Sequence, residues 1–118
     1  MKLTQATPAE LKVLLNHIYE LKKGVRSMAL YTTRASLCRP AVERLEQQGI
    51  RYAVQRVGSG RVNIYFGRPE CIDAIALLVR RPLNLLTPEE DFILGALLGY
   101  DICGQCRRYC ERKTRLGA

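Results

Sequence analysis

The feature of this 118-residue sequence that most limits its fold is a pair of apolar alternations on either side of a glycine-rich turn. Apolar side chains occupy every second position at Ile50, Tyr52 and Val54 and again at Val62, Ile64 and Phe66. A period of two is that of a β-strand with one buried face. Gly58-Ser59-Gly60 joins the runs as a tight turn. Residues 50–66 therefore predict a β-hairpin.

The rest of the chain predicts one more strand and five helices. The segment RSMALYTT predicts a strand with Met28, Leu30 and Thr32 on one face. Thr7-Pro8-Ala9-Glu10 and Thr87-Pro88-Glu89-Glu90 each combine a capping box with an early proline, so a helix begins at each. The other three helices are expected from about Pro40 to Gln48, from Pro69, and after the capping residue Asp101.

Two of these helices carry finer expectations. Gly49 stands where a left-handed helix cap belongs, and Ile50 follows it as the apolar residue that accompanies such a cap. In the helix that begins near Thr87, we expect four apolar residues to face inward: Phe92, Ile93, Ala96 and Leu97.

The element order is α-β-α-β-β-α-α-α, which predicts a single α+β domain over residues 1–118 with a three-stranded sheet and five helices. By analogy with split β-α-β folds, we expect the third strand to lie beside the first. A single helical layer would then cover the sheet. Because an uncovered face or edge in so small a protein is commonly protected by self-association, we expect a homodimer.

Composition is that of an ordinary soluble protein, with 47% hydrophobic and 25% charged residues. The amino-terminal MKLTQATPAELK has no apolar run, and the longest apolar stretches, AIALLV and FILGALLGY, are too short to cross a bilayer. We therefore expect a cytoplasmic protein. Its five cysteines are then thiols or metal ligands rather than a disulfide framework.

Charge is distributed unevenly along the chain, whose formal net charge is +8. Residues 22–61 carry nine Lys or Arg and two acidic residues, whereas residues 62–101 carry three and six. Such a field favours an acidic partner, although it also serves solubility. The candidate partner-binding residues are four arginines in and beside the predicted hairpin: Arg51, Arg56, Arg61 and Arg68.

The same hairpin has two weaker interpretations. Tyr52, Tyr65 and Phe66 among arginines resemble a nucleic-acid stacking surface, but two of these rings fall on the predicted core face and leave only Tyr65 exposed. Gly58-Ser59-Gly60 between two arginines could cradle a phosphate, but no phosphate-loop lysine follows it.

Cys103, Cys106 and Cys110 form the most distinctive chemical pattern. Their spacing places them on one face of a helix. The C-x2-C part is a half-site for zinc or an iron–sulfur cluster. A structural zinc site needs a fourth ligand, which would have to be Cys38, Cys71 or His17. Zinc or iron–sulfur binding is therefore a hypothesis and no cofactor is certain.

Two other interpretations of these cysteines remain open. Cys103 and Cys106 could form a redox dithiol, because the helix N-terminus stabilises a thiolate, although thioredoxin-type motifs follow a strand. Alternatively, cysteine acts here as a small buried hydrophobe. The helix would then pack an inward face into the core that consists of Ile102, Cys103, Cys106, Tyr109 and Cys110.

Three segments, HIYELKKG, RVNIYFGRPECIDAI and LLGYDICGQC, resemble a small bacterial family of unknown function whose members are about as long as this chain. The resemblance implies three strands, five helices and a homodimer, in agreement with the element count above. It implies no activity and no catalytic residue. It also implies an association with flavodoxin, because members tend to be encoded beside it.

We therefore predict a non-enzymatic accessory protein that docks an acidic, flavodoxin-like redox partner through its basic surface. Its catalytic candidates are few, since His17 is the single histidine and none of the three serines lies in a nucleophile elbow. The alternative is a metal-binding or thiol-redox protein that uses the cysteine helix. A nucleic-acid-binding module is a weaker alternative.

Overall fold

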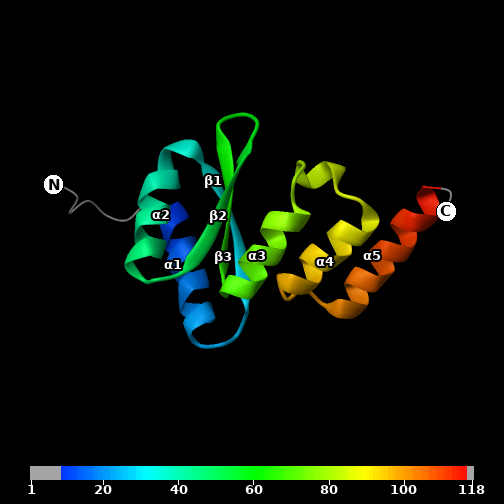
Figure 1. Cartoon of the computed structure of the whole chain (residues 1–118), viewed down its shortest axis with the longest axis horizontal. Coiled ribbons are helices and arrows are strands. Elements are labelled where there is room, and N and C mark those ends of the chain that lie inside the picture. The colour runs from blue at the N-terminus through cyan, green and yellow to red at the C-terminus, as the bar shows by residue number, and fades with distance from the viewer. Residues whose placement is uncertain (1–8, 117–118) are drawn as a thin grey trace.

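The computed structural model describes residues 9–116, which form five α-helices and three strands in the predicted order (Figure 1). The α+β prediction is therefore confirmed. The helices are α1 (Ala9–Lys22), α2 (Cys38–Gln47), α3 (Pro69–Leu78), α4 (Pro88–Leu97) and α5 (Ile102–Arg115). The strands are β1 (Met28–Arg34), β2 (Arg51–Val57) and β3 (Arg61–Gly67).

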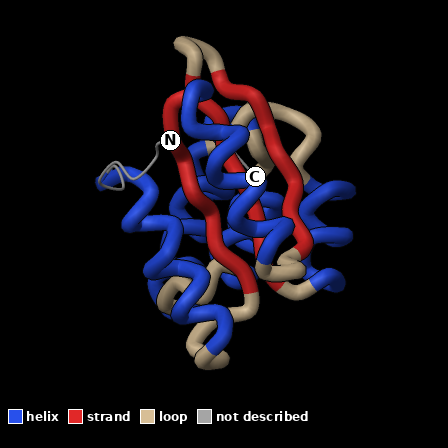
Figure 2. The backbone as a smooth tube through the Cα atoms, turned by 90° about the vertical axis from the view of Figure 1, so that its left-hand side faces the viewer, coloured by secondary structure: helices blue, strands red, loops and turns tan. Residues whose placement is uncertain are grey.

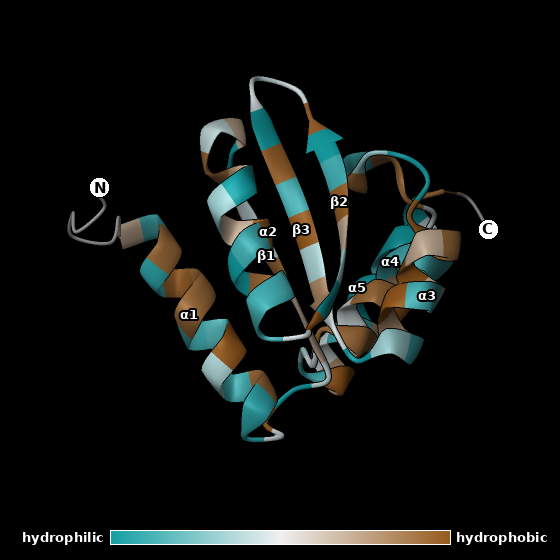
Figure 3. Ribbon diagram, turned by 60° about the vertical axis from the view of Figure 1, so that its left-hand side comes forward, coloured by the Kyte–Doolittle hydropathy of each residue, from teal (hydrophilic) through white to brown (hydrophobic). Residues whose placement is uncertain are grey.

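β3 is the central strand of the sheet, whose order is β1-β3-β2. Both neighbours run antiparallel to it, and Tyr31 of β1 and Val54 of β2 both lie opposite Ile64. The third strand thus lies beside the first, as predicted for a split β-α-β arrangement. β3 alternates between apolar residues on one face and larger or polar residues on the other (Figure 3). Residues 62–67 are nevertheless all buried, so both faces of this strand are covered.

Helices cover both faces of the sheet, so the prediction of a single helical layer is wrong. α1 and α2 lie on one side of the strands, and α3, α4 and α5 lie on the other (Figures 1 and 2). The sequence pattern missed the second layer because we treated only the even-numbered face of β3 as buried. Tyr65, on the opposite face, is 1% exposed and packs among the residues of the second layer.

Two hydrophobic cores result from this arrangement. The first lies between the sheet and the pair α1–α2 and consists of Leu14, Ile18, Ala29, Tyr31, Ala41, Leu45, Val62, Ile64 and Phe66. The second lies on the other face and consists of Met28, Tyr65, Ile72, Ile75, Leu86, Leu94 and Leu98. The sheet therefore stands between two separate cores rather than covering one.

Local backbone chemistry follows the sequence signals at most helix ends. Gly49 has a φ of +70°, and the amide of Ile50 donates to the carbonyl of Leu45 at 2.9 Å, as in the predicted helix cap. Thr87 and Glu90 form the predicted capping box, and Asp101 caps α5 by accepting from the amide of Gly104 at 2.8 Å. The predicted cap at Thr7-Pro8 lies outside the described residues.

Two helix predictions need correction. α2 begins at Cys38 rather than at Pro40, because proline is tolerated anywhere in the first turn, where its missing N–H has no helical partner. In α4 the buried residues of the apolar segment are Leu94, Gly95 and Leu98, whereas Ile93 is 39% exposed. Apolar residues occur on every side of this segment, so their periodicity does not predict which side is buried. The position of the second core decides it.

The molecule is elongated from α1 at one end to α5 at the other (Figure 1). Its radius of gyration is 15.6 Å. A compact domain of this size has a value of about 13 Å. We call α4 and α5 the arm: α4 reaches the second core through Leu94 and Leu98, and α5 lies outside it with no buried residue in its described length.

Candidate functional site

The fold separates the four candidate arginines into two pairs. Arg51 lies opposite Gly67, the residue that precedes Arg68, so these two arginines are at the open end of the hairpin. Arg56 and Arg61 lie at the other end, beside the turn. Strands of seven residues span about 20 Å between their ends. This is twice the distance over which exposed charges act on one another at physiological salt, about 8–10 Å. The two pairs therefore act as separate charged sites.

The pair at the open end of the hairpin is already matched by carboxylates. Arg51 donates to Asp73 at 2.6 Å, and the guanidinium of Arg68 lies 3.9 Å from Glu70. Both pairs are exposed and lie beside the start of α3. These two arginines therefore contribute little net field for an external acidic partner.

The turn end of the hairpin gathers a different set of basic residues. Arg34 lies directly opposite Arg61 in the register of β1 and β3, and Arg39 follows five residues later in the first turn of α2. Ala35 donates to the carbonyl of Gly60 at 2.7 Å, which fixes the end of β1 against the hairpin turn. We call Arg34, Arg39, Arg56 and Arg61 the hairpin-end arginines.

Among the described residues, one carboxylate pairs with this group. Glu10 accepts from Arg34 at 3.0 and 3.4 Å, and the other three hairpin-end arginines are exposed without an ion pair in residues 9–116. Sequence reasoning missed Arg34 and Arg39 because they are remote from the hairpin along the chain. Only the pairing of β1 with β3 brings them to the same end of the sheet.

The predicted stacking surface on the hairpin does not form. Tyr65, which we expected to be the exposed ring, is 1% exposed, Phe66 is fully buried, and Tyr52 is half-buried with its hydroxyl donating to Glu46 at 2.7 Å. Burial raises the pKa of Tyr65 to about 12, against a smaller opposing effect of a hydrogen bond with Asn63. No free aromatic platform is left on the described strands for a base to stack on.

α5 presents its three cysteines to solvent, so of the three interpretations the one in which they pack into the core is wrong. Cys103, Cys106 and Cys110 are all exposed free thiols, and α5 has no buried residue in its described length. Ile102, expected on the same inward face, is 52% exposed. The residues of α5 that turn toward α4 and the sheet are instead polar or aromatic: Gln105, Arg108, Tyr109 and Arg112.

Ion pairs with α4 explain why α5 turns its polar and aromatic face, and not its cysteine face, inward. Asp91, in the first turn of α4, accepts from Arg108 at 2.7 and 3.2 Å and lies 3.7 Å from Arg112. Glu89 contacts Lys113 at 2.9 Å and accepts from the Tyr109 hydroxyl at 3.0 Å. The hydrogen bond from Lys113 is the main cause that lowers the pKa of Glu89, and the contact with Asp91 raises the pKa of Arg108.

The possible fourth ligands lie away from the cysteine face of α5. Cys38 packs against the first core, on the opposite face of the sheet, and Cys71 of α3 packs against the second. His17 of α1 lies 3.6 Å from Glu20, with its ring 6.4 Å from that of Phe66. Within residues 9–116, no three His, Cys, Asp or Glu side chains are placed to hold a metal ion together.

An apolar groove lies beside the exposed thiols. Its cavity of about 410 Å³ between α4 and α5 is lined by Glu89, Phe92, Ile93, Cys106, Tyr109 and Cys110. The rings of Phe92 and Tyr109 are 5.8 Å apart and tilted by 60°, so they form a packed aromatic floor. The outer face of the arm thus combines apolar surface with thiols.

These features define a class of protein: a small α+β protein with a split β-α-β core, a basic hairpin end and a helical arm that carries exposed thiols. Residues 12–112 match the family described as Protein of unknown function (DUF2023), and the chain belongs to this family. A search of curated proteins gives no match. No helix among residues 9–116 has the length and apolar character needed to cross a membrane.

Proposed function

We propose that this protein is a non-catalytic accessory protein of the cytoplasm that docks an acidic redox partner of the flavodoxin kind. The hairpin-end arginines form the docking surface. The observation that carries the proposal is the position of Arg39, Arg56 and Arg61, which are exposed without an ion pair in the described chain. An acidic partner supplies the missing negative charge and is steered to this end by the field.

The geometry also supports a specific orientation of the partner. The open end of the hairpin has its arginines matched by Asp73 and Glu70, so its field is weaker. A negatively charged surface is therefore attracted to the turn end in preference to the open end. The contact there is mainly electrostatic, which suits a transient complex with fast association and dissociation.

Titration against an acidic flavodoxin at low ionic strength tests this proposal. The double variant R56Q/R61Q is expected to bind about tenfold more weakly than the wild type, because two unmatched charges are lost from the contact. The matched control R51Q/R68Q removes the same formal charge from the open end and is expected to change the affinity less than about twofold. Equal losses in the two variants, or no binding of the wild type, contradict the proposal.

Self-association is the second part of the proposal, and the arm is the surface we assign to it. One of the two reasons for expecting a homodimer, an uncovered sheet face, no longer holds, because helices lie on both faces. Phe92, Ile93 and Tyr109 instead form an apolar surface on the outside of α4 and α5, where a second copy can present the same residues in a two-fold arrangement. Light scattering is expected to show a dimer for the wild type and a monomer for I93D.

The second candidate function is thiol or metal chemistry on α5. The observation that favours it is the exposure of Cys103, Cys106 and Cys110 along one helix face, where they have no packing role. A zinc or iron–sulfur site needs more ligands than the described chain brings together, so a second copy would have to supply them.

Elemental analysis with a thiol count on anaerobically purified protein tests this second candidate. Stoichiometric zinc or iron, with thiols that react only after chelation, supports a metal site. C103S/C106S is then expected to lose the metal and to keep the docking affinity, because these residues lie on the arm and not at the hairpin end. Five freely reactive thiols without metal reject the metal hypothesis and leave thiol chemistry.

A further inference from the structure

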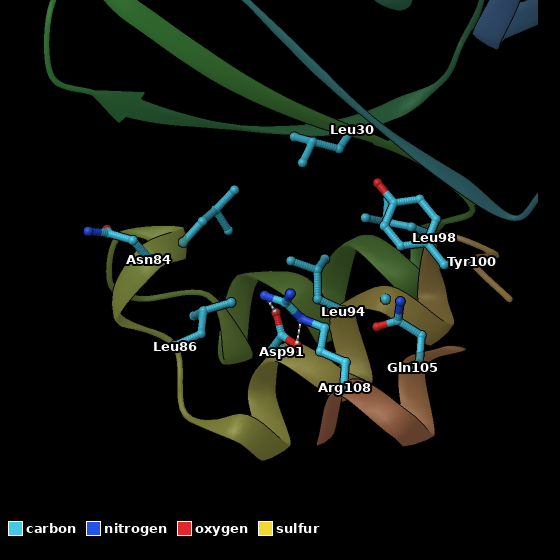
Figure 4. A pocket seen from close by; sticks show the side chains of 11 residues that line it. Leu30, Asn84, Leu86, Asp91, Leu94, Leu98, Tyr100, Gln105 and Arg108 are labelled. Carbon is cyan, nitrogen blue, oxygen red and sulfur yellow. Dashed lines mark hydrogen bonds and ion pairs between the residues drawn. The ribbon is translucent and has the colours of Figure 1, made fainter. Parts of the chain in front are cut away.

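A second cavity, separate from the groove beside the thiols, lies between the sheet and the arm (Figure 4). Its volume is about 410 Å³. This value falls in the range of small-molecule sites, about 300–1,000 Å³. Leu30 reaches into the cavity from β1, opposite Leu94 of α4, and Leu83, Leu86 and Leu98 complete an apolar lining. The site is therefore a cleft between two layers, and its apolar walls suit a flat ring.

Polar side chains with free hydrogen-bond donors and acceptors lie at the rim of this cleft. Asn84 lies on one side, and Tyr100 and Gln105 lie on the other (Figure 4). None of the three side chains hydrogen-bonds to another described residue. Each of the two carboxamides offers both a donor and an acceptor, which matches the paired donor and acceptor edge of a ring amide or amidine.

The charges inside the cleft cancel. Arg108 uses its Nε and Nη2 atoms to donate to Asp91, and both side chains line the floor as one bidentate pair. An anionic ring would find no free cation there, and a cationic ring would find no free carboxylate. The ring that fits is neutral.

A third cavity, of about 400 Å³, lies next to the cleft on the hairpin side, and the two share Leu83 and Asn84 in their linings. Arg56 lines it near the hairpin turn, and its floor on the sheet is a chain of neutral polar groups. Thr32 donates to Asn63 at 2.6 Å, and Asn63 donates to Gln55 at 3.1 Å. Gln55 in turn donates to the carbonyl of Arg81 at 3.1 Å, which holds the row in place. Such a fixed row of hydroxyl and amide groups suits a polyhydroxylated chain or sugar.

We propose that these two adjacent cavities together bind a nucleoside-type ligand, namely a neutral planar heterocycle with an amide or amidine edge joined to a sugar or polyol. The ring lies between Leu30 and Leu94, with its polar edge on Gln105 and its sugar-bearing side toward Asn84. The hydroxyl groups lie over Thr32, Gln55 and Asn63. The shared wall at Asn84 marks the junction between ring and sugar. This site does not depend on the cysteines of α5, and it shares one residue, Arg56, with the docking surface.

Substitution of Gly95 is the most specific way to disturb the site. A Cβ atom at this position would overlap the carboxamide of Gln105, whose side chain lies directly over the glycine. The variant G95A must therefore displace Gln105 from the rim. Alanine also favours the helix more than glycine does, so G95A is not expected to destabilise α4.

Chemical-shift titration of the wild-type chain with guanosine, adenosine and riboflavin tests the proposal and distinguishes purine from flavin ligands. At least one of them is expected to bind with a dissociation constant of about 10–500 µM, given the size of these ligands and the openness of the cleft. The shifted amides should include those of Leu94 and Asn84. Ribose alone lacks the ring and is expected not to bind.

Two variants of the site and two control variants decide whether the site is the assigned one. G95A and Q105L are expected to weaken binding at least fivefold, and Q47L, the same change on the exposed face of α2, is expected to leave it unchanged. R61Q serves as a control for the docking surface and is also expected to leave it unchanged. The proposal is overturned if none of the three ligands binds at millimolar concentration, or if Q105L binds as the wild type does.

Discussion

The two ends of this molecule are held together by different forces. The body, made of α1, α2 and the sheet, encloses a core in which Ala29, Leu45, Ile64 and Phe66 are completely buried. The arm, made of α4 and α5, joins its helices largely through charged and aromatic contacts at Asp91, Glu89 and Tyr109. Both parts expose some apolar residues, such as Val13 and Tyr19 on α1 and Ile93 on α4, but α5 has no buried residue in its described length and carries its three thiols in solvent.

This difference has an energetic consequence. Burial of apolar surface stabilises a fold by about 25 cal/mol per Å², or about 1.5–3 kcal/mol for a large side chain. Exposed ion pairs contribute about 0–1 kcal/mol each. α5 is therefore expected to open from α4 at a lower cost than unfolding of the body, and segments of low local stability are where partners and ligands commonly act.

The largest expected effect comes from the body. I64A removes a fully buried side chain from the centre of β3 and should lower the free energy of unfolding by about 3 kcal/mol. I93A, the same substitution on the outer face of the arm, should change it by less than about 0.5 kcal/mol in the monomer. Urea unfolding of both variants measures the difference. Similar losses would show that the arm is packed as tightly as the body.

A smaller effect is expected at the contact between α4 and α5. D91N removes the charge that pairs with Arg108 and Arg112, and Asp91 is only 17% exposed, so α5 should lose about 1 kcal/mol of local stability. Hydrogen exchange should become faster in α5 and stay unchanged in β3. D73N, which breaks an exposed pair with Arg51, is the matched control and should leave α5 unaffected. Faster exchange throughout the protein would contradict the separation of body and arm.

The hairpin turn offers a stabilising change of about 0.5 kcal/mol. Ser59 has a φ of +67°, a left-handed conformation that disfavours residues with a Cβ atom. S59G removes this strain but also makes the unfolded chain more flexible, so the net gain is modest. A rise in the melting temperature with unchanged exchange in α5 is expected. A lower melting temperature would mean that the serine stabilises the turn by a contact of its own.

The smallest effect is expected from pH. The pKa of Glu89 in the fold lies below its ordinary value of 4.5, mainly because Lys113 donates to it. The contact is therefore fully present above pH 4.5 and is lost as the pH falls through the lowered pKa. Resonances of Tyr109 and Lys113 should report this loss in the wild type and should not titrate in E89Q. An unchanged titration in E89Q would assign it to another group.

Sequence reasoning succeeded where structure is local. The hairpin, the cap at Gly49 and the capping box at Thr87 depend on residues within a few positions of each other, and all three form as predicted. The neighbouring position of β1 and β3 followed from a general topological rule rather than from particular residues.

Sequence reasoning failed where contacts between segments distant along the chain decide which face of a helix is buried. The cysteine face of α5 is more apolar than the face with Arg108 and Arg112, so periodicity predicts that the thiols are inside. The opposite holds because Glu89 and Asp91 attract the basic face. Three consecutive acids at the start of α4 and the spacing of the basic residues in α5 were a usable signal.

The strand order also bears on how the chain is made. β1 and β2 each pair with β3 in the described sheet, and β3 is the last of the three strands to be synthesised. At about 5–20 residues per second, the nascent chain spends roughly 0.5–2 s with two strands and no partner for either. The first core can close once Val62, Ile64 and Phe66 are made, whereas the second also needs Leu94 and Leu98 of the later helices. Translation past residue 67 therefore pairs the strands and allows the first core to close, and a ribosome that pauses before it leaves two exposed strand edges to which other chains can pair.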